Sequence, residues 1–390
     1  MTTKQLNKRL SKKVQAIQPS GIRRFFDLAS SMDNIISLGV GEPDFVTPWN
    51  VREASISSME RGFTAYSANA GIIELREAIA DYMSSRFAAD YDPETEVLVT
   101  VGASEAIDVG MRAILDEGDE VIVVEPSFVS YAPLVSMAGG VPVAVGTNID
   151  TDFKVTAAQL EAAITSRTKA MMLCFPNNPT GSTMNREELK AIAELAERHD
   201  LLVFSDEIYA ELTYDEKHVC FSSLEGMKER TVIISGFSKA FAMTGWRLGF
   251  VCAPPDLLSA MLKIHQYSLM CAPTMAQYGA LEALKTGMDE VYRMKQSYKQ
   301  RRNYFIKSFA EIGLTCHTPG GAFYAFPSIE KTGLSSEQFA EKLLMEERVA
   351  VVPGYVFGSG GEGHIRCSYA TSMDNLEQSV ERIGRFLKQF

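Results

Sequence analysis

The stretch SGFSKAFAMTGWRLG, residues 235–249, lies between two short apolar runs, Thr231–Ile234 and Phe250–Ala253. Both runs have the length and composition of buried strands. Lys239 follows the first run among small residues, and Arg247 comes eight residues later. A lysine beside a strand end and near a second cation is placed for a depressed pKa and for carbonyl chemistry. A surface lysine on a loop is the alternative that spacing alone leaves open.

The same alternation continues through the middle of the chain, where short apolar runs are separated by amphipathic stretches. The predicted strands are Glu96–Val101, Glu120–Val124, Lys169–Phe175, Leu201–Phe204, Thr231–Ile234 and Phe250–Ala253, and the predicted helices are Ser104–Leu115, Tyr131–Ala138 and Arg186–His199. This order is typical of βαβ units and predicts an α/β fold with a mostly parallel central sheet flanked by helices. Ligands of such sheets bind outside the carboxyl ends of the strands.

Two polar segments follow predicted strands and are therefore candidate site segments. In residues 204–209, FSDEIY, Asp206 comes just after an apolar strand, where a carboxylate needs a cation or a strong donor. Tyr209 is three residues on and would point the same way on a helical turn; an N-cap aspartate with a core tyrosine is the alternative. In residues 175–181, FPNNPTG, a cis Asn178–Pro179 bond would direct the Asn178 amide into the strand-end crevice, and a plain turn is the alternative.

Anion binding is predicted at two places. Ser238 and Arg247 are suited to hold a phosphate. The main-chain N–H groups of Ala103 and Ser104, in residues 100–105 (TVGASE), stand at a predicted helix N-terminus, which binds anions readily. A capping box in this segment is compatible with that interpretation.

After about residue 285 the pattern changes to a smaller α+β region. Its predicted elements are a helix through Met294–Glu311, a helix at Ser335–Glu347, the strands Val349–Val352 and His364–Tyr369, and a final helix at Met373–Gln389. We expect three parts: residues 1–46 as an N-terminal arm and part of the small domain, 47–285 as the large domain, and 286–390 as the C-terminal small domain. Residues 358–363, GSGGEG, match a dinucleotide motif but precede a predicted strand instead of a helix, so we interpret them as a loop.

Composition excludes several classes of protein. The 390 residues carry 38 basic and 49 acidic side chains, a net charge of −11, which argues against a nucleic-acid partner. The five histidines and six cysteines show no metal-ligand spacing, so no metal site is expected, and the scattered cysteines favour reduced thiols in a cytoplasmic protein. No apolar run is long enough to span a membrane, and the basic N-terminus lacks the apolar segment of a secretory signal.

Together and in this order, the segments resemble class I/II aminotransferases of the pyridoxal-phosphate fold type I, or aspartate aminotransferase, superfamily. The resemblance runs from residues 39–45, GVGEPDF, to residues 366–370, RCSYA. The Ser-x-x-Ser-Lys…Gly-x-Arg-x-Gly pattern of residues 235–249 is specific for that superfamily. The resemblance implies a large cofactor-binding domain, a smaller domain from both termini, and pyridoxal 5'-phosphate as the cofactor.

The resemblance also implies roles for single residues. Lys239 resembles the lysine that forms the internal aldimine and moves the Cα proton, and Asp206 resembles the partner of the pyridine nitrogen. Tyr209 and Asn178 resemble the donors to the cofactor's phenolic oxygen. Phe128, in PSFVSY, occupies the place of the ring that stacks on the pyridine, where many relatives have tryptophan.

The anionic groups have implied partners as well. The phosphate would be held by Ala103, Ser104, Ser238 and Arg247, and Gly236 stands where many relatives have a serine or alanine. Tyr66 resembles a tyrosine that reaches the phosphate from the neighbouring subunit, which implies a homodimer with shared active sites. Arg366, with the Gly41 main chain and Asn178, resembles the site for the substrate α-carboxylate, where a planar guanidinium suits two parallel hydrogen bonds.

The implied activity is transamination from an L-amino acid to a 2-oxo acid, 2-oxoglutarate or pyruvate, by a ping-pong aldimine/pyridoxamine mechanism. Ser104 stands where some aspartate-preferring relatives carry lysine, so we expect alanine, an aromatic amino acid or an acylated diamino acid as donor rather than strictly aspartate. A lyase of the same fold that performs C–S β-elimination is the alternative. An amino-acid sensor is less favoured because about forty residues before Gly41 leave no room for a DNA-binding domain, and an NAD-dependent dehydrogenase lacks its strand–GxGxxG–helix motif.

Overall fold

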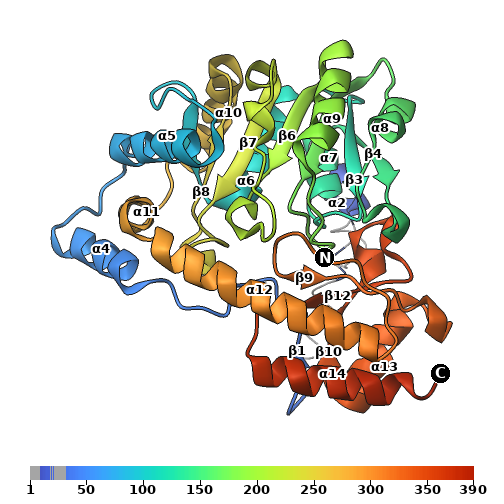
Figure 1. The fold of residues 1–390 in the computed structure, drawn as a ribbon. Helices are drawn as coiled ribbons and strands as arrows, with labels where there is room; N and C mark the ends of the chain where they lie inside the picture. The colour runs from blue at the N-terminus through green and yellow to red at the C-terminus, as the bar shows by residue number, and fades with distance from the viewer. Residues whose placement is uncertain (1–8, 18, 20, 22–31) are drawn as a thin grey trace.

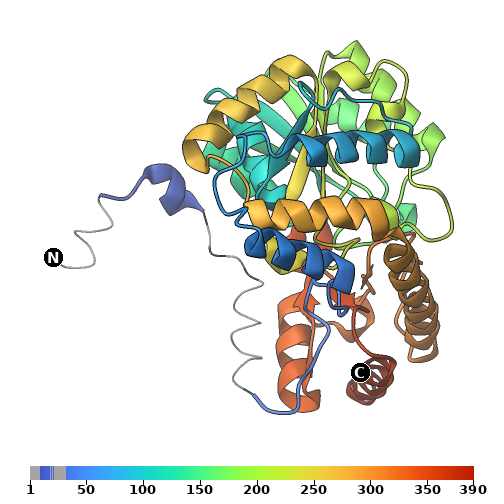
Figure 2. The ribbon, with the colours of Figure 1, turned by 90° about the vertical axis from the view of Figure 1, so that its left-hand side faces the viewer.

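The computed structural model describes residues 9–17, 19, 21 and 32–390. It consists of a large sheet layer and, below it, a smaller group of strands and helices (Figures 1 and 2). The predicted N-terminal arm lies partly outside the described residues. The boundaries at 46/47 and 285/286 stay a prediction, although the smaller group draws its strands from both ends of the chain.

Seven strands form the large sheet, in the order β2-β8-β7-β6-β5-β3-β4. Their bounds are β2 Val97–Thr100, β3 Glu120–Glu125, β4 Val141–Gly146, β5 Thr168–Cys174, β6 Leu202–Asp206, β7 Thr231–Gly236 and β8 Gly249–Cys252. The pairs from β4 to β7 are parallel, and β8 is antiparallel to both β7 and β2. The prediction of a mostly parallel sheet is confirmed. It missed β4, the edge strand, in which Pro142 interrupts an otherwise apolar run and only Val145 is buried.

The strands alternate their side chains between two covered faces. One face packs against α6 (Gly102–Ile114), α7 (Tyr131–Ala138) and α10 (Pro255–Ser268). The other packs against α5 (Ile73–Phe87) and α11 (Thr274–Thr286) at one end and against α8 (Ala157–Ala163) and α9 (Arg186–Arg198) at the other. Because both faces are buried, the carboxyl edge of the sheet is the place left for a ligand.

Within the described residues, the smaller group contains two short sheets and three α-helices. The parallel pair β1 (Ile36–Ser37) and β10 (Val349–Ala350) joins the N-terminal and C-terminal segments. The second sheet has the order β11 (Val352–Pro353), β12 (Ile365–Ser368) and β9 (Tyr324–Ala325). The helices α12 (Met288–Glu311), α13 (Ser336–Glu347) and α14 (Met373–Leu387) pack around these strands (Figure 1).

The single strand predicted at Val349–Val352 is wrong, because the chain changes sheets at Val351. Val349 and Ala350 pair with β1, whereas Val352 and Pro353 pair with β12. Outside these two short sheets, α4 (Trp49–Glu60) packs on α11, and the short helix α2 (Lys12–Ala16) contacts α7. The remaining predicted helices and strands are confirmed, with some ends displaced by several residues.

Candidate active site

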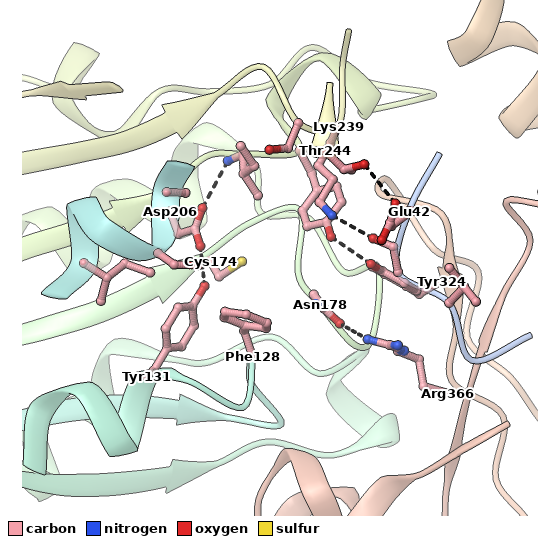
Figure 3. Close-up of a pocket in the computed structure, with 18 of the residues that line it drawn as sticks. Glu42, Phe128, Tyr131, Cys174, Asn178, Asp206, Lys239, Thr244, Tyr324 and Arg366 are labelled. Carbon is pink, nitrogen blue, oxygen red and sulfur yellow. Dashed lines mark hydrogen bonds between the residues drawn. The ribbon is translucent and has the colours of Figure 1, made fainter. Parts of the chain in front are cut away.

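A cavity of about 780 Å³ opens at the carboxyl ends of β5, β6 and β7 (Figure 3). The side formed by the sheet layer, here called the sheet wall, comprises Ala103, Ser104, Phe128, Tyr131, Cys174, Asn178, Asp206, Tyr209, Ser238, Lys239 and Arg247. The opposite side, here called the lower wall, comprises Gly39, Val40, Gly41, Glu42, Tyr324 and Arg366. All predicted site residues except Tyr66 line this cavity.

Lys239 lies three residues beyond the end of β7, and its Nζ donates to the Gly41 carbonyl oxygen at 2.7 Å. Burial lowers the pKa of Lys239 to about 8, and the nearby cations Arg366 and Arg247 act in the same direction, while Glu42 opposes them. A substantial fraction of the amine is therefore neutral near pH 8, which is the form that acts as a nucleophile or base.

Asp206 is the last residue of β6 and is 5% exposed. Its carboxylate accepts from the Tyr131 hydroxyl at 2.6 Å and from the Ile208 N–H at 3.2 Å. Burial raises the pKa of Asp206 to about 6, although the bond from Tyr131 lowers it. A cationic donor in the cavity would stabilise the ionised carboxylate, because no cation among the described residues forms a hydrogen bond with it.

Tyr131 is a site residue that the sequence interpretation did not assign. It begins α7, three residues after Phe128, and burial next to Asp206 raises its pKa well above the usual value, so it remains a donor. The Phe128 ring packs edge-on against Tyr131 at 5.6 Å between centroids. The signal available in the sequence was the three-residue spacing between Phe128 and Tyr131, which places both aromatic side chains near the start of one helix.

Residues 207–210 form a turn, closed by the bond from the Ala210 N–H to the Glu207 carbonyl oxygen at 3.0 Å, and a 3-10 helix follows at Ala210–Leu212. Tyr209 lines the cavity, and its hydroxyl lies 2.8 Å from that of Tyr324. The Asn178–Pro179 bond is cis, as are Glu125–Pro126 and Phe175–Pro176. Asn178 reaches across the cavity, where its Oδ1 accepts from Arg366 Nη1 at 2.9 Å.

An anion cradle lies where α6 begins. Gly102 has φ +78°, and a Cβ added there would come within 2.7 Å of Arg247 Nη2. A side chain at this position would require the Arg247 guanidinium to shift, and the positive φ itself favours glycine. With the helix N-terminus, these groups form a site suited to a phosphate.

The capping box considered for this segment is not formed. Val101 is the N-cap residue, and its N–H donates to the Glu105 carboxylate at 2.5 Å. The Thr100 hydroxyl instead donates to the Gly102 carbonyl oxygen at 3.0 Å. The α6 N–H groups that follow therefore have no capping side chain from Thr100 or Val101.

Arg366 forms the charged centre of the lower wall. It is 3% exposed and donates to Asn178 Oδ1 and, at 2.7 Å, to the Gly39 carbonyl oxygen. Its Nε is buried without a hydrogen-bond partner. The rings of Tyr324 and Phe357 lie 4.5 and 5.0 Å from its guanidinium carbon. A buried cation with only neutral acceptors is suited to bind an anion that enters the cavity.

Tyr66 does not line the cavity and is 79% exposed. Among the described residues, no cluster of histidine, cysteine, aspartate or glutamate is arranged to hold a metal ion. None of the helices in the described ranges has the length and apolar character that crossing a membrane requires.

The arrangement agrees with comparisons to known proteins. Residues 33–383 match the model of the family described as aminotransferase class I and II. A Bacillus subtilis protein provisionally named aminotransferase YugH is 64% identical, over 97% of this chain and 98% of the relative. The Pyrococcus abyssi aspartate aminotransferase is 44% identical over 97% of this chain and 98% of its own.

Solved structures show the same fold. The aromatic aminotransferase of Pyrococcus horikoshii superposes with a TM-score of 0.90 at 44% identity, over 95% of this chain and 99% of that one. Relatives named for aspartate and for aromatic substrates are thus equally similar to this chain. The family is nevertheless clear, and this chain is a member of the aminotransferase class I and II family.

Proposed function

We propose that this aminotransferase binds pyridoxal 5'-phosphate in the cavity and moves an amino group from an L-amino acid to a 2-oxo acid. One observation carries the proposal. A desolvated lysine amine and a buried carboxylate border the same cavity, between an anion cradle and a buried arginine that has no anionic partner in the described part of the chain.

The residues present fit this cofactor. The cradle at Gly102 would be filled by a Cβ, so its space is available only to a ligand or to the glycine backbone. The Asp206 carboxylate faces the cavity with two neutral donors and a raised pKa, which suits a pyridine nitrogen that carries a proton. The charges of the lining residues also suit this cofactor and its substrate, because Arg247, Lys239 and Arg366 surround space for a phosphate and a substrate carboxylate.

We assign the holding residues accordingly. Ala103, Ser104, Ser238 and Arg247 would hold the phosphate, and Asp206 would hold the ring nitrogen. Tyr209 and Asn178 would hold the phenolic oxygen, with Phe128 against the ring. When bound, the cofactor supplies an aldehyde carbon for the amino group and a ring that accepts electron density from the substrate Cα.

The chain's own groups then bind the substrate and move protons. Arg366 and the Gly41 main chain would orient the α-carboxylate, which fixes the Cα–H bond relative to Lys239. Neutral Lys239 would take the proton from the substrate Cα. It would later donate this proton to the carbon that the cofactor supplies. Asp206 would remain ionised, because a cationic nitrogen opposite it reverses the effect of burial on its pKa.

The class of amino donor follows from the cations of the cavity that are not already assigned to the cofactor or to the α-carboxylate. The cations that line the cavity in the described chain are Lys239, Arg247 and Arg366, and each already has a role. Ser104 adds no further cation. We therefore propose a donor with a neutral side chain, such as alanine, an aromatic amino acid or an acylated diamino acid. The acceptor is 2-oxoglutarate or pyruvate, and the same argument favours pyruvate, because the second carboxylate of 2-oxoglutarate would find no further cation among the described residues of this cavity.

We further infer a homodimer in the cytoplasm. Tyr66 is exposed in the single chain, as are Trp49 and Tyr267, which suits a surface that a second copy covers. A tyrosine at position 66 would then contribute to the partner's phosphate site. The six free cysteines are typical of a reducing compartment.

The central test is Lys239→Ala, with Lys285→Ala on the exposed side of α11 as the control. We expect the first variant to stay folded and to lose roughly 10³-fold or more in transamination rate, and the control to keep the wild-type rate. Full turnover by Lys239→Ala would refute the assignment.

Product analysis separates transamination from the lyase alternative. The wild-type enzyme, given a panel of amino acids with 2-oxoglutarate or pyruvate, should form the new amino acid and release no ammonia. Ammonia and a 2-oxo acid formed without any acceptor would instead show β-elimination.

A further inference from the structure

We propose that Tyr324 is a positioning residue that links the carboxylate-binding Arg366 to the hydroxyl of Tyr209. The inference rests on the proposed function of this site and adds a residue to it. Neither the 235–249 motif nor any other segment quoted for the family resemblance contains Tyr324.

Tyr324 is 1% exposed and lies on β9, where it pairs with Ser368 of β12, two residues from Arg366. Its hydroxyl is 2.8 Å from the Tyr209 hydroxyl, and its ring lies 4.5 Å from the Arg366 guanidinium carbon. A Cβ added to Gly41 would come within 2.9 Å of the Tyr324 hydroxyl. One side chain therefore contacts three of the predicted site residues, Tyr209, Arg366 and Gly41, from three distant segments.

The direction of the bond between the two hydroxyls decides what Tyr209 can do. Each phenol has one hydrogen to donate. If Tyr324 donates to Tyr209, the hydrogen of Tyr209 is left for an oxygen in the cavity. If Tyr209 donates to Tyr324, it has no hydrogen left for a ligand.

The surroundings favour Tyr324 as the donor. Burial raises the pKa of both phenols and the Arg366 guanidinium opposes that rise in both, but only for Tyr324 is the guanidinium the strongest effect after burial. For Tyr209, the neighbouring Tyr324 instead raises the pKa. The more acidic phenol is the better donor, so Tyr324 leaves the Tyr209 hydrogen directed to the ligand.

The same geometry makes this link sensitive to the substrate. A carboxylate bound by Arg366 would neutralise the charge that acidifies Tyr324. The donor strength of Tyr324, and through it that of Tyr209, would then change when the amino acid binds. Tyr324 would transmit occupation of the carboxylate site to the phenolic-oxygen side of the cavity.

The test compares Tyr324→Phe with Tyr209→Phe and with the double variant in the cofactor-loaded enzyme. The readout is the pH midpoint of the bound cofactor's visible absorption band. We expect Tyr324→Phe to raise this midpoint by about half a pH unit, a part of what one hydrogen bond contributes. The shift caused by Tyr209→Phe should be larger, and in that background Tyr324→Phe should cause none.

Tyr369→Phe is the matched control. Tyr369 is fully buried beside the same sheet and its hydroxyl donates to the Ala322 carbonyl oxygen at 3.3 Å, but it does not line the cavity. The control should leave the midpoint unchanged, with the thermal unfolding of all variants measured on the same samples. A Tyr324→Phe midpoint equal to wild type, or a shift that persists in Tyr209→Phe, would overturn the inference. A wild-type protein with no visible band would instead refute the proposed cofactor.

Discussion

The two walls of the cavity are built in different ways. In the sheet wall, most residues lie within a few residues of a strand end, as do Asp206, the last residue of β6, and Lys239, three residues beyond β7. In the lower wall, Gly39 and Arg366 are 327 residues apart and meet through one hydrogen bond. The sheet wall is local in sequence, and the lower wall exists only through tertiary structure.

Strand pairing explains how the lower wall is assembled. Leu38 N–H donates to the Ala350 carbonyl oxygen at 2.8 Å, and Ser368 N–H donates to the Leu38 carbonyl oxygen at 2.7 Å. Residues 39–41 are thereby held next to β12 and Arg366. The walls differ in burial too, since Arg247 is exposed in the sheet wall and Arg366 is buried in the lower wall.

The largest difference is expected between Arg366→Lys and Arg247→Lys. Lysine cannot replace the planar fork that is fixed by Asn178 and Gly39, so Arg366→Lys should lower kcat/KM for the amino acid roughly 10²-fold at saturating cofactor. Arg247→Lys should raise the cofactor Kd about tenfold, because main-chain donors share that anion. Steady-state kinetics and a cofactor titration measure the two effects. If both variants lost kcat/KM equally, substrate binding and cofactor binding would not be separated between the two walls.

The next largest effect is expected on the free energy of unfolding of the cofactor-free protein, and it comes from the buried charge of Asp206. Its pKa rises from 3.8 to about 6 on folding, so the folded state binds this proton more tightly than the unfolded state. Its contribution to stability is therefore present below about pH 4 and is lost as the pH rises through 6. Asp206→Asn should increase the free energy of unfolding by up to about 3 kcal/mol at pH 8 and by little at pH 4.

Asp215 is the opposite-sign control for this measurement. A hydrogen bond from Arg302 is the main cause that lowers the pKa of Asp215 to about 2, so its ionised form stabilises the folded state. Asp215→Asn should reduce stability at pH 8. Urea unfolding at both pH values provides the comparison, and a loss of stability in Asp206→Asn at pH 8 would contradict the burial argument.

The smallest effect is expected at the cradle. Gly102→Ala introduces both an unfavourable φ of +78° and a contact with Arg247, so the cofactor Kd should rise about tenfold. Gly118→Ala has a similar φ, +91°, with nothing near the added Cβ. It should lose comparable stability in thermal unfolding but keep the cofactor affinity. The same loss of affinity in both variants would assign the effect to backbone strain.

Sequence reasoning was most successful where a pattern is local. The strand–helix alternation predicted six of the seven strands of the large sheet, because periodicity and buried apolar runs report directly on each segment. The residues after β5, β6 and β7 were predicted for the same reason. Their roles stay predictions, although their side chains line one cavity.

The features that the sequence did not predict depend on contacts between distant segments or on very short strands. Tyr131 and Tyr324 were not assigned, because their partners, Asp206 and Tyr209, are 75 and 115 residues away. The sheet change at Val351 was missed because two-residue strands are too short for a period to be seen. Tyr66 was predicted to act on another copy of the chain, which a single chain does not test.

The pairing of residue 38 with strands near the C-terminus has a consequence for biosynthesis. A ribosome releases the sheet layer first, and the cradle and Lys239 can take shape while the last part of the chain is still being made. The carboxylate site has to wait for residues 349–368. We expect a nascent chain stopped before that point to hold the phosphate of the cofactor but to lack Arg366, and with it the site for the amino acid carboxylate. Substrate recognition is therefore the last property that the molecule acquires.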